Sequence, residues 1–141
     1  MRYVLDASVA LKWILPELDT PRAVRLRNAH RQQQHELLAP DIFPAEVAHA
    51  LTRAERRGIL APPEAARRLL LVLRTAPFLH PYLLLLRRAV DISSARQVGV
   101  YDCVYVALAE REGCELVTAD AKLVTSLGAA FPFIIPLSSL P

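Results

Sequence analysis

The chain has 141 residues and a formal net charge of +3, and 53% of its residues are hydrophobic. This length fits one domain with a sizeable core, spanning residues 1–141, and the hydrophobic fraction excludes an intrinsically disordered chain. The mild basic bias permits a nucleic-acid partner without establishing one. The apolar runs 69–73 and 82–86 are each ended by arginine and are too short to cross a membrane.

Short apolar runs alternate with longer helical patterns along the chain. The runs predict strands over 2–5, 36–39, 115–118 and 133–135, and the connection 77–81 offers a fifth, shorter candidate. Helical periodicity, proline starts and glycine stops predict helices over 7–15, 22–34, 42–57, 61–74, 82–97, 101–112 and 121–127. We expect Pro16 to end the first helix and Gly58 and Gly113 to end two later ones. This alternation predicts an α/β fold with a mainly parallel, short-stranded central sheet covered on both faces.

Four carboxylates stand near the ends of these predicted elements. Asp6 and Asp120 each close a strand-like run, Asp102 opens an apolar helix, and Glu46 lies early in another helix. In a parallel sheet the strands end at the edge where the following helices begin, so four distant acids can meet in one pocket. Such acids repel one another unless a cation neutralises them, and hard oxygen ligands suit Mg²⁺ or Mn²⁺. All four acids are therefore our candidate catalytic residues and metal ligands.

Helix capping is the alternative explanation for the three aspartates. Aspartate at a helix start often accepts a backbone hydrogen bond, and Asp6, Asp102 and Asp120 each stand where a cap would stand. Glu46 lies past the cap of its helix and does not fit this explanation. Asp102 borders the run 103–109, which is apolar on every face and therefore predicts a buried helix, so its carboxyl group would carry a raised pKa. Both explanations stay open for each aspartate taken singly.

Several polar residues near the acids are candidates for supporting roles. Ser8 and Thr118 each lie two residues from an aspartate, where a hydroxyl can orient the carboxylate or form a local hydrogen bond at a helix start. Lys12, Arg53 and Arg57 are candidate phosphate contacts, and the two arginines follow the glutamate by about two and three helical turns. A solvated helix face is the alternative explanation for each of these three cations.

Other chemistries lack their sequence signatures. Glu46 and His49 have the Glu-x-x-His spacing of di-iron sites, but that chemistry uses two copies and the chain has one. The sequence contains no GxSxG, GxGxxG or Walker A motif. A haloacid-dehalogenase-type phosphatase would need a second aspartate where Ser8 stands. Cys103 and Cys114 have no zinc spacing, and we interpret them as reduced thiols of a cytoplasmic protein.

Four segments carry a family likeness, and together they contain all four acids: 4–13, 39–47, 101–109 and 116–120. In this order they resemble the PIN-domain ribonucleases, specifically the VapC-type toxins of prokaryotic toxin–antitoxin pairs, over essentially the whole chain. The resemblance implies a PIN-like α/β/α sandwich. It maps the acidic site of the family onto Asp6, Glu46, Asp102 and Asp120, with Ser8 and Thr118 as supporting hydroxyls. The chain departs from the family at His49, where asparagine is common.

The resemblance also implies cleavage of RNA that depends on Mg²⁺ or Mn²⁺, a homodimer, and a small antitoxin protein that covers the site. We therefore predict a metal-dependent endoribonuclease with one or two ions among the four acids. One alternative is a non-catalytic PIN-like module that binds RNA or protein. Another is a DNA nuclease or phosphatase with the same acids, because a metal-activated water needs no 2′-hydroxyl group. Only the resemblance favours RNA.

Overall fold

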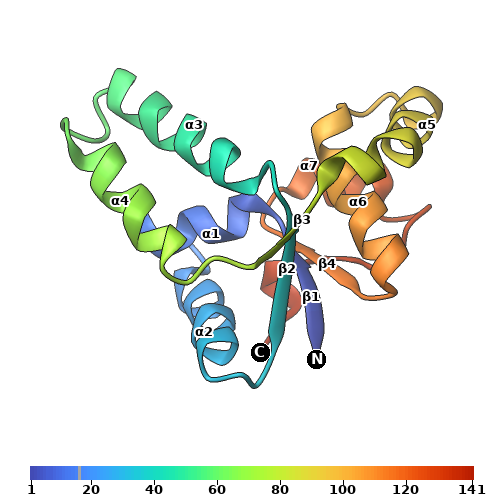
Figure 1. The fold of residues 1–141 in the computed structure, drawn as a ribbon, viewed down its shortest axis with the longest axis horizontal. Helices are drawn as coiled ribbons and strands as arrows, with labels where there is room; N and C mark the ends of the chain where they lie inside the picture. Colours follow the sequence, from blue (N-terminus) through green and yellow to red (C-terminus); the bar gives the residue numbers. More distant parts are fainter. Residues whose placement is uncertain (16) are drawn as a thin grey trace.

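A parallel five-stranded sheet forms the centre of the computed structural model, which describes residues 1–15 and 17–141 (Figure 1). The strands are β1 (Arg2–Leu5), β2 (Glu36–Pro40), β3 (Phe78–His80), β4 (Glu115–Thr118) and β5 (Ile134–Pro136). Their order across the sheet is β3-β2-β1-β4-β5, and every neighbouring pair is parallel. The register places Val4 of the central strand beside Leu38 and Leu116.

Helices cover both faces of this sheet. They are α1 (Ala7–Ile14), α2 (Thr20–Arg31), α3 (Phe43–Arg56), α4 (Glu64–Leu73), α5 (Leu86–Arg96), α6 (Val100–Glu112) and α7 (Ala121–Leu127). Two short 3₁₀ turns follow strands, η1 (Tyr82–Leu85) after β3 and η2 (Leu137–Ser139) after β5. Helices α1 and α2 lie on one side of the sheet, whereas α6 packs on β1, β2 and β4 from the other side with α5 beside it (Figure 1). The predicted α/β/α sandwich is therefore confirmed.

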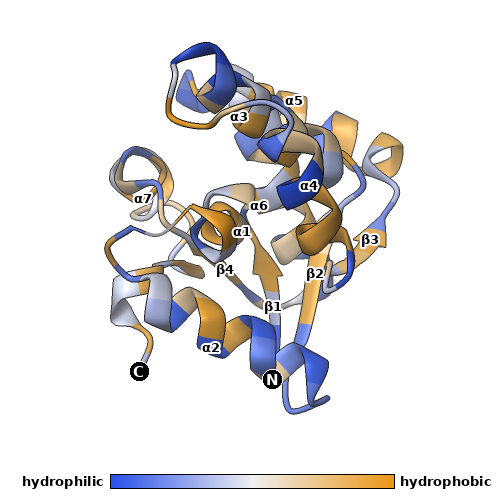
Figure 2. Cartoon of the chain, turned by 90° about the vertical axis from the view of Figure 1, so that its left-hand side faces the viewer, coloured by the Kyte–Doolittle hydropathy of each residue, from blue (hydrophilic) through white to orange (hydrophobic). Residues whose placement is uncertain are grey.

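The burial of each element follows from its sequence pattern. Helix α6 is buried without interruption from Cys103 to Ala109, because it is enclosed between the sheet and α5. Helix α3 is instead amphipathic and buries Phe43, Val47 and Leu51 at helical spacing. In Figure 2, β2 is coloured as hydrophobic over most of its length, as expected for a strand covered on both faces.

The predicted elements are all present, and their ends differ by a few residues. The helix predicted over 82–97 begins as the 3₁₀ turn η1 before α5 continues it. Gly58 and Gly113 follow α3 and α6 with φ angles of 75° and 65°, a conformation that suits glycine. Helix α1 ends at Ile14, and the prediction that Pro16 stops it falls outside the described residues. Within 1–15 and 17–141, no helix is both long and apolar enough to cross a membrane.

Candidate active site at the carboxyl edge of the sheet

The order of the strands defines one edge where a ligand is expected to bind. The chain runs outward from β1 through β2 to β3 and then returns to β4 on the other side of β1. Ligands of open parallel sheets bind outside the carboxyl ends of the strands at such a reversal. Asp6 directly follows β1, and Asp120 lies two residues beyond β4. The reversal therefore brings these two acids, which are far apart in the sequence, to the same edge of the sheet.

Two hydroxyl groups hold the Asp6 carboxylate at this edge. Ser8 Oγ donates a hydrogen bond to Asp6 Oδ2 over 2.5 Å, and Thr118 Oγ1 donates to the same oxygen over 2.9 Å. Each hydroxyl oxygen also accepts a backbone N–H, Ser8 from Ala119 and Thr118 from Asp120, both over 3.0 Å. The predicted orienting role of both hydroxyls matches this geometry. Asp6 is only 7% exposed, and its side chain makes no capping bond to α1.

Glu46 reaches the same region from α3 and meets a residue that the sequence analysis missed. It is the fourth residue of α3 and lies past the cap, as predicted. Tyr105 OH donates a hydrogen bond to Glu46 Oε1 over 2.7 Å. The Tyr105 ring is fully buried in α6, so its hydroxyl needs a polar partner in the interior. The signal in the sequence was the position of Tyr105, one helical turn after Asp102.

The capping explanation is correct for Asp120 and wrong for Asp102. Asp102 is the third residue of α6, whose N-cap is Gly99, so the proposed capping role of Asp102 is wrong. Among the described residues, no donor forms a hydrogen bond with its half-buried carboxylate. Asp120 is the N-cap of α7 and accepts the backbone N–H of Lys122 over 2.9 Å. Capping therefore occupies one oxygen of Asp120 and leaves its second oxygen to the site.

Burial and mutual repulsion raise the pKa values of three of these acids. Burial raises the pKa of Glu46 to about 7, and the charges of Asp6 and Asp102 act in the same direction. Burial likewise raises the pKa of Asp102 to about 6, with Asp6 and Asp120 adding repulsion. The pKa of Asp6 is raised by burial against the opposing hydrogen bonds from Ser8 and Thr118. These shared influences show that the four acids form one electrostatic group.

The donor set has the chemistry of a site for a hard divalent cation, but it does not form a closed ligand shell. All four groups are carboxylates, and the half-buried Asp102 has no hydrogen-bond donor to satisfy it. Within residues 1–15 and 17–141, no three His, Cys, Asp or Glu side chains lie close enough to share one ion. Separation of the carboxylates lowers their repulsion. Side-chain rotation would be needed to bring three of them around a cation.

The candidate phosphate contacts differ in their availability. Lys12 Nζ lies 3.2 Å from Glu17 Oε2, and the side chain of Lys12 is only 13% exposed. It lines a cavity of about 190 Å³ that Thr118 and Asp120 also line. Arg53 is exposed on the outer half of α3, and the exposed Arg57 follows its last residue. The guanidinium groups of Arg53 and Arg57 are therefore more accessible to a phosphate than the ammonium group of Lys12.

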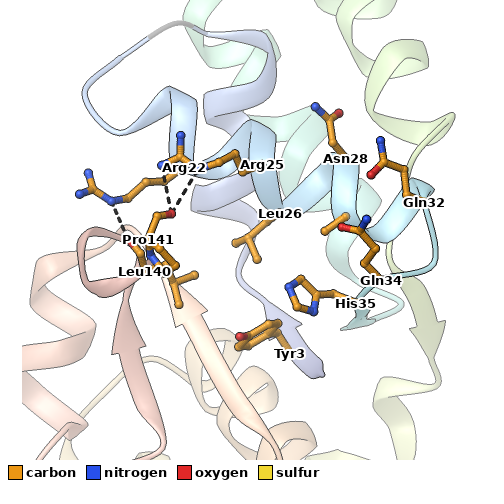
Figure 3. A pocket seen from close by; sticks show the side chains of 11 residues that line it. Tyr3, Arg22, Arg25, Leu26, Asn28, Gln32, Gln34, His35, Leu140 and Pro141 are labelled. Atoms are coloured by element: carbon orange, nitrogen blue, oxygen red, sulfur yellow. Dashed lines mark hydrogen bonds between the residues drawn. The ribbon is translucent and has the colours of Figure 1, made fainter.

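A second cavity, of about 400 Å³, lies away from the acids between α2 and the C-terminal segment (Figure 3). Tyr3 and His35 line it near the amino ends of β1 and β2, which is the opposite edge of the sheet. Arg22 Nε donates to the carbonyl oxygen of Leu140 over 2.7 Å, and Arg25 donates to Pro141 O. Backbone oxygens thus bind the two arginines that line this cavity. The carboxyl edge of the sheet is therefore the better candidate for an active site.

The raised pKa values predict how stability depends on pH. The pKa of Glu46 rises from 4.5 to about 7 and that of Asp102 from 3.8 to about 6, so the folded state binds these protons more tightly than the unfolded state. The resulting penalty is absent below about pH 4 and complete above about pH 7. With a chelator present, the gain in unfolding free energy from Glu46→Gln should therefore increase between these pH values. Urea denaturation of both proteins measures it.

Glu110→Gln is the matched control for this experiment. Its hydrogen bond to Arg88, 2.7 Å long, lowers the pKa of Glu110, so this carboxylate stabilises the folded state as pH rises. Glu110→Gln should therefore lower the free energy of unfolding relative to wild type, and this loss should grow as pH rises through a range below about pH 4.5. The effect should be small because the pair is exposed. A pH-independent difference between Glu46→Gln and the wild type would contradict the predicted coupling.

Comparisons with known proteins agree with the fold. The family model described as the PIN domain matches residues 3–125. Ribonuclease VapC3 of Pyrobaculum aerophilum is 35% identical over 131 residues, which cover 92% of this chain and 97% of the relative. Ribonuclease VapC9 of Mycobacterium tuberculosis is 30% identical over 132 residues, covering 94% of this chain and 96% of the relative.

Solved structures agree as well. PAE2754 from Pyrobaculum aerophilum superposes with a TM-score of 0.67 at 26% identity, covering 99% of this chain and 94% of that protein. VapBC2 from Rickettsia felis, bound to a promoter DNA fragment, gives a TM-score of 0.66 over 96% of this chain and 97% of that one. At 14% identity this second likeness concerns the fold alone. The matched family model and the similar ribonucleases together show that the chain belongs to the PIN-domain family.

Proposed function

We propose that this chain is a divalent-metal-dependent endoribonuclease and the toxin of a toxin–antitoxin pair, acting in the cytoplasm as one nuclease domain over residues 1–141. The observation that carries the proposal is the group of four coupled carboxylates, Asp6, Glu46, Asp102 and Asp120, at the carboxyl edge of the sheet. The ribonuclease names of the similar VapC proteins support RNA as the substrate, because the acids alone do not discriminate RNA from DNA.

In this proposal the protein positions carboxylates around the scissile phosphate. Asp6, Glu46 and Asp102 would bind Mg²⁺ or Mn²⁺ directly, and Asp120 would bind it directly or through water. The ion would supply Lewis-acid stabilisation of the developing charge and a more acidic bound water. Ser8 and Thr118 fix the orientation of Asp6, and Tyr105 fixes that of Glu46. These contacts reduce the conformational freedom that ligand binding would otherwise have to remove.

Activity should require a hard divalent cation, because the candidate ligands are carboxylates and no thiolate joins them. Cleavage of purified structured RNA should cease in a chelator and return when Mg²⁺ or Mn²⁺ is added in excess. Gel electrophoresis of end-labelled RNA measures the cleavage, with single- and double-stranded DNA tested in parallel. Undiminished cleavage of RNA after rigorous removal of metal would contradict metal dependence, and preferential cleavage of DNA would contradict the substrate.

Asp102→Asn tests the site itself, because it removes one charge while it keeps the shape of the side chain. Without metal, the melting temperature should hold or rise, since repulsion in the acid group falls. Metal-induced stabilisation should shrink, and RNA cleavage should fall by more than about 100-fold, the upper range for residues that merely support a metal ligand. Thermal denaturation with and without Mg²⁺, together with the cleavage assay, measures all three effects.

The control for this substitution is Asp91→Asn. Asp91 is exposed on α5 and pairs with Arg87 over 3.5 Å, away from the acid group. Its substitution should leave cleavage and metal-induced stabilisation unchanged, because surface ion pairs contribute little. A folded Asp102→Asn protein with full activity would exclude Asp102 as an essential ligand.

A homodimer and a small antitoxin partner complete the proposal. Exposed apolar side chains support protein partners: Leu70 and Leu73 on α4 are 59% and 42% exposed, and Leu83 and Leu84 on η1 are 71% and 74% exposed. Light scattering across micromolar concentrations should give the mass of a dimer, and a co-encoded antitoxin should inhibit cleavage. A monodisperse monomer over this range would contradict the dimer, and full cleavage in a saturated complex would contradict inhibition.

A further inference from the structure

Helix α3 carries Arg53, and Arg57 directly follows its last residue. These arginines come seven and eleven residues after Glu46, so at 3.6 residues per turn Arg53 lies on the same helix face as Glu46, and Arg57 lies close to the continuation of that face at the helix end. This face lies beside the buried stripe that contains Val47 and Leu51. Figure 1 shows α3 extending outward from the carboxyl end of β2, so the acid lies near the sheet and the arginines lie farther along the helix.

Neither arginine is paired with a carboxylate in the residues that the structure describes. On the adjacent helix α4, Arg67 and Arg68 instead share Glu64. The negative end of the helix dipole favours a cation in the last turn of α3. This effect does not account for the alignment of both arginines with Glu46.

We propose that Arg53 and Arg57 bind two phosphates of one single-stranded RNA whose scissile phosphate lies beside Glu46. This inference rests on the proposed function. With a rise of 1.5 Å per residue, the arginines stand roughly 10 Å and 16 Å from Glu46 along α3. At about 3.4 Å per stacked nucleotide, these distances correspond to about three and five nucleotides from the scissile bond. The planar guanidinium group matches the geometry of a phosphate.

The surface of α3 favours a nucleic acid over a protein partner. The acid group repels a phosphate backbone, so cations beyond it would hold the strand in place. A protein interface would instead need buried apolar or aromatic anchors at its centre. Helix α3 exposes no large apolar side chain, and its exposed positions include His49, Thr52 and Arg56. Helix α3 therefore offers charge and hydrogen bonds beside Arg53, and the nearest exposed large apolar side chain along the chain, Ile59, lies beyond the end of the helix.

The salt dependence of binding tests this inference quantitatively. A 20-nucleotide oligouridylate is titrated with the protein in EDTA at several KCl concentrations, and fluorescence anisotropy gives the affinity. Each lost phosphate contact reduces the slope of log K against log salt by about 0.7 for a single strand, so Arg53→Ala/Arg57→Ala should reduce it by about 1.4. In the cleavage assay, the same variant should raise KM and leave kcat nearly unchanged.

The control variant is Arg31→Ala/Arg74→Ala, which removes two exposed arginines that form no salt bridge with the described residues. These residues end α2 and follow α4, each before a strand begins, and so lie toward the amino edge of the sheet. The control should keep the wild-type slope. Equal slope changes in both variants, or none in the Arg53/Arg57 variant, would overturn the inference.

Two further outcomes distinguish RNA binding by Arg53 and Arg57 from protein binding and from the proposed RNA cleavage. If the Arg53/Arg57 variant keeps the wild-type salt dependence of RNA binding but binds polyglutamate more weakly than wild type, the two arginines belong to a protein-binding surface and the inference fails. If wild type cleaves no RNA with Mg²⁺ or Mn²⁺ but its salt dependence of RNA binding still exceeds that of the Arg53/Arg57 variant, the proposed function fails while phosphate binding by the two arginines stands. Melting temperatures of both double variants should stay near that of wild type, because surface substitutions change stability little.

Discussion

The hydrogen bonds around Asp6 make a buried carboxylate tolerable beside three other acids. A buried carboxylate without donors would be expected to become protonated, because burial and like charges both raise its pKa. Ser8 and Thr118 each accept a backbone N–H, which directs their hydroxyl hydrogens toward Asp6 Oδ2. The two accepted N–H groups belong to Ala119 and Asp120, just beyond β4. One network therefore joins the ends of β1 and β4 and orients the carboxylate between them.

The other acids are held to different degrees, and this difference bears on how a cation could bind. Tyr105 OH holds one oxygen of Glu46, and the N–H of Lys122 holds one oxygen of Asp120. Asp102 has no such partner among the described residues, although it shares their electrostatic environment. Three acids thus have preset orientations, and the fourth can turn toward a ligand without breaking a hydrogen bond.

The sequence predicted the parts of the site that depend on local order. Asp6 and Asp120 follow strands, so a parallel sheet places them at its carboxyl edge without further information. The pairing of β1 with β4 could not be read from local pattern, because 110 residues separate Ser8 from Thr118. The capping alternative for Asp102 is wrong because α6 begins at Val100, two residues before Asp102, so that Gly99 is the N-cap.

The contact between Tyr105 and Glu46 shows a different limit of sequence reasoning. The two residues are 59 positions apart and lie on helices whose relative placement depends on the packing of α6 against the sheet. The uniformly apolar pattern of α6 predicted its burial but not which side chain would face Glu46. A tyrosine in such a helix has one polar atom to satisfy, so its position was a usable signal.

The placement of helix α3 determines where Glu46 and the two arginines, Arg53 and Arg57, lie relative to one another. Its buried face, with Phe43, Val47 and Leu51, fixes the rotation of the whole helix against its neighbours. The helical period then places Glu46 and Arg53 on one face, and Tyr105 OH in addition orients the Glu46 carboxylate. The charge along this face changes from negative near the sheet to positive at the outer end, which opposes the repulsion that the acids exert on a phosphate strand. A change in the register of α3 would therefore displace both charges at once.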